Sequence, residues 1–311
     1  MTHLTSPNGT PAGALAFGTM QFGGRANESE SRAMYDAARA AGLTHFDTAW
    51  IYTDGVSETL LGRFAKAERE QLYIATKVGN RGGAGVANLS AQFDDCRRRL
   101  GMDAVDLLYL HLFDPNTELS HTLDWFARQQ SDGLIRHIGL SNFAAWQVMK
   151  AQGIAAAMGT RIDAIQPMYN LVKRQAEVEI LPMAADQGIA VFPYSPLGGG
   201  LLTGKYAEGG AGRLTEDARY ATRYGQDWMH RTAADFARLA REEGHDPATL
   251  AVAWAARHPA RPCPIISARS AAQLAPSLAA LEVTLDDDTY ARIGALSQTP
   301  PPATDRSETA I

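Results

Sequence analysis

Residues 72–111 read LYIATKVGNRGGAGVANLSAQFDDCRRRLGMDAVDLLYLH, and this stretch decides the fold. It opens with a short apolar run of strand-like composition, 72–77, and closes with another, 105–111. Between them, 89–100 has helical periodicity, with Ser90 as its expected N-cap and Gly101 at its end. The stretch therefore predicts a strand, a helix and a second strand, joined by a right-handed crossover.

The same unit recurs along the whole chain. Strand-like runs lie at 15–19, 44–47, 72–77, 105–111, 135–141, 164–166, 190–194 and 264–267. They follow one another at nearly even spacing up to the seventh, and an amphipathic helix at 28–41 separates the first two. An open doubly wound sheet is the competing layout, but no Gly-x-Gly-x-x-Gly follows any of these runs.

Eight such units predict an α/β fold, a single (β/α)8 or TIM barrel made by residues 1–311. The barrel core is expected at about 15–281, and the Pro-rich end, 299–311, is expected to be irregular. The extra length lies after the seventh strand, between about 196 and 246. We expect a long loop there, and its Gly-rich start favours mobility.

Composition and charge exclude several classes of function. The 311 residues include 29 basic and 34 acidic side chains, a net charge of −5, so a nucleic-acid partner is not expected. The chain has neither a signal peptide at its start nor a run of eighteen apolar residues, so we expect a cytoplasmic protein with no membrane partner. Cys96 and Cys263 lack metal-ligand spacing and are expected to be reduced thiols.

Polar side chains stand at the end of each apolar run, where barrel enzymes place their chemistry. They are Thr19, Asp47, Lys77, His111, Ser141, Asn142, Gln166, Tyr194, Ser267 and Arg269. Polar residues are common wherever a strand leads to solvent, so the presence of these ten residues at strand ends does not by itself identify a reaction.

Asp47, Tyr52, Lys77 and His111 carry more specific chemistry if they share one mouth of the barrel. A neighbouring cation favours the phenolate of a tyrosine, which then serves as a general acid toward a carbonyl oxygen and as a base in reverse. The competing interpretations are a surface lysine, a core histidine with satisfied nitrogens and an aromatic residue at the rim. These side chains make a poor ligand set, so no metal site is predicted.

Ordered motifs at these positions carry a family resemblance. They are Phe46-Asp-Thr-Ala-Trp-Ile-Tyr52, Ser57-Glu58, Leu61-Gly62, Thr76-Lys77, Asp106-Leu-Leu-Tyr-Leu-His111, Gly139-Leu-Ser-Asn-Phe143, Gln166, Tyr194-Ser-Pro-Leu-Gly198 and Leu201-Leu-Thr-Gly-Lys205. In this order they resemble the aldo-keto reductases over essentially the whole chain. The resemblance implies reduction of a small aldehyde or ketone by hydride from a nicotinamide. Tyr52 would donate the proton, Lys77 paired with Asp47 would lower the phenol pKa, and His111 would orient the carbonyl.

The resemblance also implies a set of cofactor-binding residues. The carboxamide of the nicotinamide would be held by Ser141, Asn142 and Gln166, and its ring would stack on Tyr194. The ribose would lie beside Thr19 and Met20, and the pyrophosphate beside Ser195, Leu197 and Lys205. The adenosine end would contact Ser267, Arg269 and Gln273. Many members have Gly, Asn or Glu where this chain has Ser267, Pro276 and Ser277. Because Arg269 suits a 2′-phosphate, NADPH is expected rather than NADH.

The substrate end is less defined by the sequence. Trp50 and Phe113 are expected either to reach the substrate or to pack between helices, and the N-terminal hairpin of the family is shortened to a Pro- and Gly-containing lead. The physiological substrate, the direction of the reaction and the oligomeric state stay open. Alternatives to a carbonyl reductase are an NAD(P)⁺-dependent sugar or alcohol dehydrogenase, and a cofactor-binding interaction protein or redox sensor like the family's potassium-channel subunits. An unrelated barrel lyase or hydrolase is a further alternative.

Overall fold

Eight parallel strands form the frame of the structure, a computed structural model that describes residues 4–207 and 209–306. The strands are β1 (Ala16–Gly18), β2 (His45–Asp47), β3 (Tyr73–Val78), β4 (Val105–Leu110), β5 (Ile135–Ser141), β6 (Ala164–Gln166), β7 (Ala190–Val191) and β8 (Ile265–Ile266). Each strand from β1 to β6 pairs with the next in sequence, and β8 pairs with β1. Beyond β7, Ile265 N donates to Pro193 O at 2.9 Å, which joins the last two strands. The predicted (β/α)8 barrel is confirmed.

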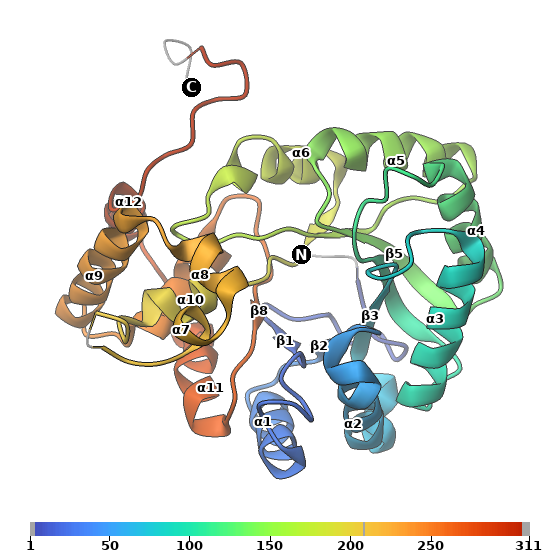
Figure 1. Cartoon of the computed structure of the whole chain (residues 1–311), viewed down its shortest axis with the longest axis horizontal. Coiled ribbons are helices and arrows are strands. Elements are labelled where there is room, and N and C mark those ends of the chain that lie inside the picture. Colours follow the sequence, from blue (N-terminus) through green and yellow to red (C-terminus); the bar gives the residue numbers. More distant parts are fainter. Residues whose placement is uncertain (1–3, 208, 307–311) are drawn as a thin grey trace.

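Helical segments cover the outside of the strands (Figure 1). The α-helices are α1 (Glu28–Ala40), α2 (Val56–Ala65), α3 (Val86–Leu100), α4 (Leu119–Ser131), α5 (Ala145–Ala157), α6 (Ile180–Gln187), α7 (Arg213–Glu216), α8 (Ala218–Tyr224), α9 (Asp227–Glu242), α10 (Pro247–Arg257), α11 (Ala271–Leu278) and α12 (Asp287–Ala295). The 3-10 helices are η1 (Tyr52–Gly55), η2 (Lys66–Gln71), η3 (Gln175–Glu177), η4 (Gly198–Thr203) and η5 (Ala279–Glu282). None of these helices is both long and apolar enough to cross a bilayer, as far as the described residues go.

The alternation of side chains along a strand divides the core into two layers. In β3, Ile74 and Val78 belong to the large apolar cluster that packs against the helices. Tyr73 and Ala75 belong to a smaller cluster inside the barrel. Lys77 continues the inward series, because it lies two residues after Ala75. Strand periodicity therefore directs this lysine into the barrel.

The N-terminal segment closes the bottom of the barrel. Thr5 and Pro11 form an antiparallel bridge, and Leu4 and Ala12 are completely buried in the inner cluster. The shortened lead thus still makes a small hairpin that fills the barrel bottom.

One helix start differs from the expectation. The helix α3 begins at Val86 after Gly85, and Ser90 lies inside it, where its hydroxyl accepts a hydrogen bond from Trp125 Nε1 at 2.9 Å. Ser90 is therefore not the N-cap. The helix ends at Gly101, whose φ of 63° satisfies the left-handed cap conformation.

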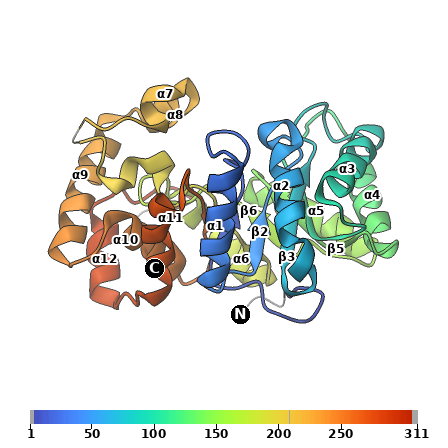
Figure 2. The same cartoon turned by 90° about the horizontal axis from the view of Figure 1, so that it is seen from below.

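The long segment after β7 is mostly helical, containing η4, α7, α8 and α9. At its Gly-rich start, Leu201 and Leu202 are buried in the core, and the mobility expected there stays a prediction. Its glycines, Gly198, Gly199 and Gly200, all have positive φ values, so they are needed for the turn itself. Figure 2 shows α7 and α8 projecting at one end of the barrel.

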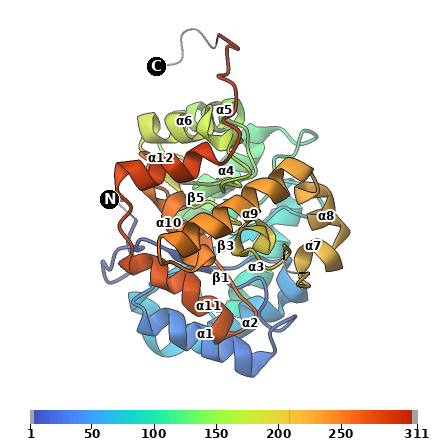
Figure 3. The same cartoon turned by 90° about the vertical axis from the view of Figure 1, so that its left-hand side faces the viewer.

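The fold continues past residue 281. Helix α12 packs against α10, as α9 does (Figure 3). Its Ile293 is completely buried. Residues 299–306 contain neither helix nor strand. The remainder of the predicted irregular tail, 307–311, lies outside the described residues.

Candidate active site

A cavity of about 760 Å³ opens where the strands end, within the range common for ligand sites. Its walls include most of the strand-end residues singled out from the sequence, namely Asp47, His111, Ser141, Asn142, Gln166, Tyr194, Ser267 and Arg269. Residues far apart in the chain thus meet at one mouth.

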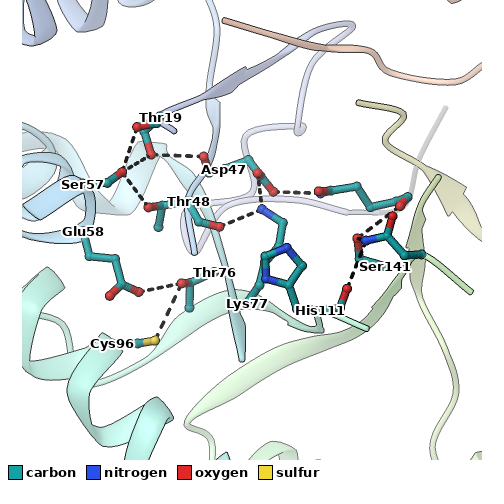
Figure 4. Close-up of polar contacts among 12 residues, drawn as sticks. Thr19, Asp47, Thr48, Ser57, Glu58, Thr76, Lys77, Cys96, His111 and Ser141 are labelled. Atoms are coloured by element: carbon teal, nitrogen blue, oxygen red, sulfur yellow. Dashed lines mark hydrogen bonds and ion pairs between the residues drawn. The ribbon is translucent and has the colours of Figure 1, made fainter. Parts of the chain in front are cut away.

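A buried ion pair forms the floor of the cavity. Lys77 Nζ contacts the carboxylate of Asp47 and donates to Thr48 O at 2.7 Å (Figure 4). The side chains of Lys77 and Asp47 are 0% and 2% exposed, and Gln166 Nε2 donates to the second oxygen of Asp47 at 2.9 Å. Burial disfavours the ammonium, but attraction to Asp47 and Tyr52 raises the pKa of Lys77. A surface lysine is therefore excluded.

Tyr52 begins η1, just after β2, and lines the cavity above this ion pair. Its ring centroid lies 5.1 Å from Lys77 Nζ and 6.2 Å from the centroid of the His111 ring. Burial raises the pKa of Tyr52, and the charge of Lys77 acts in the opposite direction. The phenol therefore keeps its proton at neutral pH, while the cation that stabilises a phenolate lies beside it.

His111 follows β4 and lines the same wall of the cavity. Burial and then the charge of Lys77 lower the pKa of His111 to about 3, so its imidazole is neutral at physiological pH. Its Nδ1 atom is buried without a hydrogen-bond partner among the described residues. The interpretation as a core histidine with satisfied nitrogens is thus wrong.

A polar network from three strand ends faces the tyrosine and the histidine. Asn142 has a φ of 59°, and its Nδ2 donates to His111 O at 3.1 Å and lies 3.0 Å from Ser141 Oγ. Tyr194 donates from its hydroxyl to Asn142 Oδ1 at 2.7 Å, and Ser141 Oγ donates to Gln166 O at 3.2 Å. Hydroxyl and amide groups in this arrangement suit a planar carboxamide.

Basic and hydroxyl groups also line the cavity. The predicted residues among them and beside them are Ser195, Leu197, Lys205, Ser267, Arg269 and Gln273. Ser267 Oγ is buried without a partner in the described parts of the chain, as expected of a group that a ligand satisfies. Arg269 pairs with Glu216 at 3.0 Å, and burial followed by the charge of Arg269 lowers the pKa of Lys205. These residues fit the phosphates of a dinucleotide cofactor.

The two residues predicted to border the ribose, Thr19 and Met20, lie in different surroundings in the structure. Met20 lines the cavity, whereas Thr19 is not among the described residues of its wall. Thr19 is completely buried behind β2, where its hydroxyl lies 2.8 Å from Ser57 Oγ and its backbone N–H donates to Asp47 O at 2.9 Å (Figure 4). Thr19 thus supports the strand end at Asp47, and its contact with the ribose stays a prediction.

Neither predicted substrate residue is among the described residues that line the cavity. Trp50 donates from Nε1 to Asp95 at 3.1 Å, while Phe113 packs edge-on against Phe143, with ring centroids 5.4 Å apart. Both residues are partly buried against the large apolar cluster, and their contact with a substrate stays a prediction. Their neighbours Ile51 and Leu112 line the cavity instead.

A buried network that the sequence analysis missed holds the turn before Tyr52. Arg99 donates to Trp50 O at 3.0 Å and pairs with Glu58 at 3.2 Å. Glu58 is completely buried and also accepts a hydrogen bond from Thr76 Oγ1 at 2.7 Å (Figure 4). The Ser57-Glu58 motif was the signal for this network, but its partner Arg99 lies in α3, far away in sequence.

Further residues that line the cavity were missed, among them Asn80, Arg81, Arg213, Arg219, Tyr220 and Arg223. The signal for the last four was the density of arginines in α7 and α8. No group of three potential metal ligands occurs in the described ranges.

Comparisons with known proteins agree with this geometry. The model of the aldo/keto reductase family matches residues 14–298. The chain is 33% identical to the uncharacterized oxidoreductase YrpG of Bacillus subtilis, covering 88% of this chain and 89% of that protein. It is 32% identical to protein tas of Escherichia coli, covering 91% and 94%, respectively. It is 36% identical to human aflatoxin B1 aldehyde reductase member 2, covering 63% of this chain and 56% of that protein. The chain thus belongs to the aldo/keto reductase family, oxidoreductases that act on carbonyl compounds with nicotinamide cofactors.

Proposed function

We propose that the protein reduces aldehydes or ketones to alcohols, with NADPH as the hydride donor and Tyr52 as the proton donor. The observation that carries the proposal is a tyrosine that lies next to both a buried ammonium and a neutral histidine. The centroid of its ring is 5.1 Å from Lys77 Nζ and 6.2 Å from the centroid of the His111 imidazole.

The chemistry divides between cofactor and protein. Bound NADPH supplies the hydride that reduces the carbonyl carbon. Tyr52 Oη gives its proton to the carbonyl oxygen, and the phenolate left behind is stabilised by Lys77. Asp47 keeps the ammonium charged in its buried position. His111, being neutral, has a ring N–H with which to hold the carbonyl oxygen close to the phenol.

The raised pKa of Tyr52 favours the reductive direction. A phenol that keeps its proton is the form required of an acid, whereas oxidation of an alcohol requires the phenolate as a base. A sugar or alcohol dehydrogenase would use the same four side chains at higher pH. The cavity also favours an enzyme over a purely structural cofactor-binding subunit, because it contains both the ion pair of Lys77 and Asp47 and the polar network around Asn142.

Preference for NADPH rests on Arg269. Arg269 pairs with Glu216 at 3.0 Å, and both side chains are partly exposed, so a 2′-phosphate can replace this carboxylate as the partner of the guanidinium. A phosphate offers more charge and more acceptor atoms than a carboxylate. NADH lacks this group. Action in the cytoplasm remains an expectation from the sequence.

Fluorescence titration of the purified protein with NADPH and with NADH tests the cofactor. Addition of p-nitrobenzaldehyde to each complex then tests the reaction, through the absorbance of the reduced nicotinamide. We expect tighter binding of NADPH and its consumption after addition of the aldehyde. Binding without consumption, also with aldoses and NADP⁺, would favour an interaction protein or sensor. Absence of any binding would contradict the proposal and favour an unrelated reaction.

A further inference from the structure

The turn that begins with Tyr52 has a strained backbone. Thr53 and Asp54, the two residues after the tyrosine, have φ values of 47° and 51°, and Gly55 continues this left-handed series at 94°. Left-handed backbone is costly for residues that have a Cβ atom, and it usually occurs at single positions. Such strain persists only where the surrounding structure fixes the chain, and it concentrates at functional sites. The residues that contact this turn are therefore candidates for positioning Tyr52.

The side chain of Thr53 fixes the end of the turn that follows Tyr52. Its hydroxyl donates to Phe22 O at 2.9 Å and accepts a hydrogen bond from Ser57 N at 3.0 Å. The first bond reaches the loop after β1, and the second reaches the first turn of α2. The chain just after the tyrosine is therefore fixed to two other segments.

Arg99, in the outer helix α3, fixes the end of the turn that precedes Tyr52. Its guanidinium donates to Trp50 O at 3.0 Å and lies 5.6 Å from the centroid of the Trp50 ring. Trp50 N donates in turn to Lys77 O at 3.1 Å. The backbone of Trp50 is thus held between the strand that carries Lys77 and the guanidinium of Arg99.

The same guanidinium packs against Gly55, at the other side of Tyr52 in the sequence. A Cβ atom at residue 55 would lie 2.5 Å from the central carbon of the Arg99 guanidinium, so only glycine fits beside this side chain. The φ of 94° at Gly55 favours glycine for an independent reason. Arg99 therefore contacts the chain both before and after the tyrosine.

A buried carboxylate holds Arg99 in place. Glu58 is completely buried in α2, pairs with the guanidinium at 3.2 Å and accepts a hydrogen bond from Thr76 Oγ1 at 2.7 Å (Figure 4). Thr76 precedes Lys77 in β3, so its side chain lies on the opposite face of the strand from the lysine. Neither Arg99 nor Glu58 is among the described residues that line the cavity. They can affect the reaction only through the residues that they hold.

We propose that Arg99 is a positioning residue, which holds Tyr52 Oη at the place from which its proton reaches the carbonyl oxygen. The inference rests on the proposed function and adds to it a group outside the cavity. Proton transfer requires the two oxygens to meet at hydrogen-bond distance, and a displacement of about 1 Å can lower a rate by about 100-fold. The residues proposed to bind NADPH lie on other segments, so NADPH binding should depend little on Arg99.

The double variant R99M/E58Q tests the inference without leaving a buried charge unpaired, which keeps the loss of stability small. Single turnovers of the NADPH-loaded protein with p-nitrobenzaldehyde should be slower than in the wild type by about tenfold or more, with NADPH affinity nearly unchanged. Slower proton transfer should also raise the solvent deuterium isotope effect on this rate, which a loss of stability alone would not change. R99K keeps the charge beside Glu58 and one donor for Trp50 O, but loses the planar fork that packs against Gly55. Its rate should lie between those of the wild type and the double variant.

Two comparisons show whether Arg99 acts through the tyrosine. In a Y52F background, which has no phenolic proton to give, R99K should cause little further loss of rate. R98M is the matched control, because Arg98 is the neighbouring residue of α3, has a side chain that is 71% exposed and shares the partner Asp95 with Arg99. It removes the same charge from the same helix and should leave the rate and the isotope effect at their wild-type values.

The outcomes separate the inference from the proposed function. A folded R99M/E58Q or R99K protein with the wild-type rate would overturn the inference and leave carbonyl reduction standing. An equal loss from R99K with and without the Tyr52 hydroxyl would also overturn it, because Arg99 would then support the fold as a whole. Failure of the wild type to oxidise NADPH with p-nitrobenzaldehyde, or with any other carbonyl compound, would contradict the proposed function itself.

Discussion

Replacing Lys77 with Met removes the ammonium but keeps most of the volume of the side chain. Asp47 then remains 2% exposed with a hydrogen bond from Gln166 as its main compensation. Removing one partner of a buried ion pair typically lowers the free energy of unfolding by about 3–5 kcal/mol. We expect the lower end of this range, since the Gln166 amide still faces the carboxylate.

The pH dependence of this loss identifies its cause. Burial raises the pKa of Asp47, and Lys77 is the main opposing influence, so its removal raises this pKa further. A carboxyl whose folded-state pKa lies above its unfolded value stabilises the fold at low pH, and this contribution is lost as pH rises through the folded-state pKa. The deficit of K77M should therefore be smaller at pH 5 than at pH 8.

Urea unfolding of K77M, D47N and the double variant K77M/D47N measures both effects. The double variant should recover much of the stability, because neither charge remains buried, whereas NADPH-dependent reduction should be lost in all three. Additive losses of stability in the double variant, or a K77M deficit independent of pH, would refute the reasoning. Activity of the double variant close to wild type would show that the ammonium is not part of the chemistry.

Three further predictions concern the rest of the molecule. R269A should weaken NADPH binding by about tenfold or more and NADH binding little, as measured by fluorescence titration, and equal losses would remove the argument for the 2′-phosphate. L112A should raise the KM for an aromatic aldehyde by about threefold or more, and F113A should not, since only Leu112 lines the cavity; the reverse order would be contrary to the assignment. Burial, followed by the charge of Lys77, lowers the pKa of His45 to about 3. On acidification His45 is therefore protonated in the unfolded chain before it is protonated in the folded one. The free energy of unfolding then falls as pH decreases from about 6.5 toward 3. H45F should lose less stability than the wild type between pH 6.5 and pH 4 in urea unfolding, and parallel losses would exclude His45 as a cause.

The periodicity of the strands and the positions of their ends could be predicted from the sequence, and most residues of the site lie at these ends. Lys77 had to face the barrel interior once 72–77 was a strand, because side chains alternate between the two faces. His111 and Gln166 had to reach the same mouth as Asp47, because parallel strands end at one edge. The residues that meet at this mouth could therefore be predicted without coordinates.

Irregular segments limited how much of the remaining site could be predicted from the sequence. Trp50 and Phe113 follow strand ends, where alternation no longer fixes the direction of a side chain, and each lies one residue away from the one that lines the cavity. Thr19 lies at a strand end yet contacts Ser57 behind β2. Arg223 reaches the cavity only because α8 folds back over it, through tertiary packing that local sequence does not encode. The order of residues in the chain is thus a poor guide to the substrate end of the cavity.

Rapid mixing of the NADPH-loaded protein with p-nitrobenzaldehyde tests the central claim most directly, with wild type and Y52F compared in single turnovers. A positioned proton donor contributes about 10²–10⁴-fold, so Y52F should oxidise NADPH at least about 100-fold more slowly while binding it with nearly unchanged affinity. A Y52F rate within about threefold of the wild type, at equal NADPH affinity, would contradict the assignment of Tyr52 as the acid.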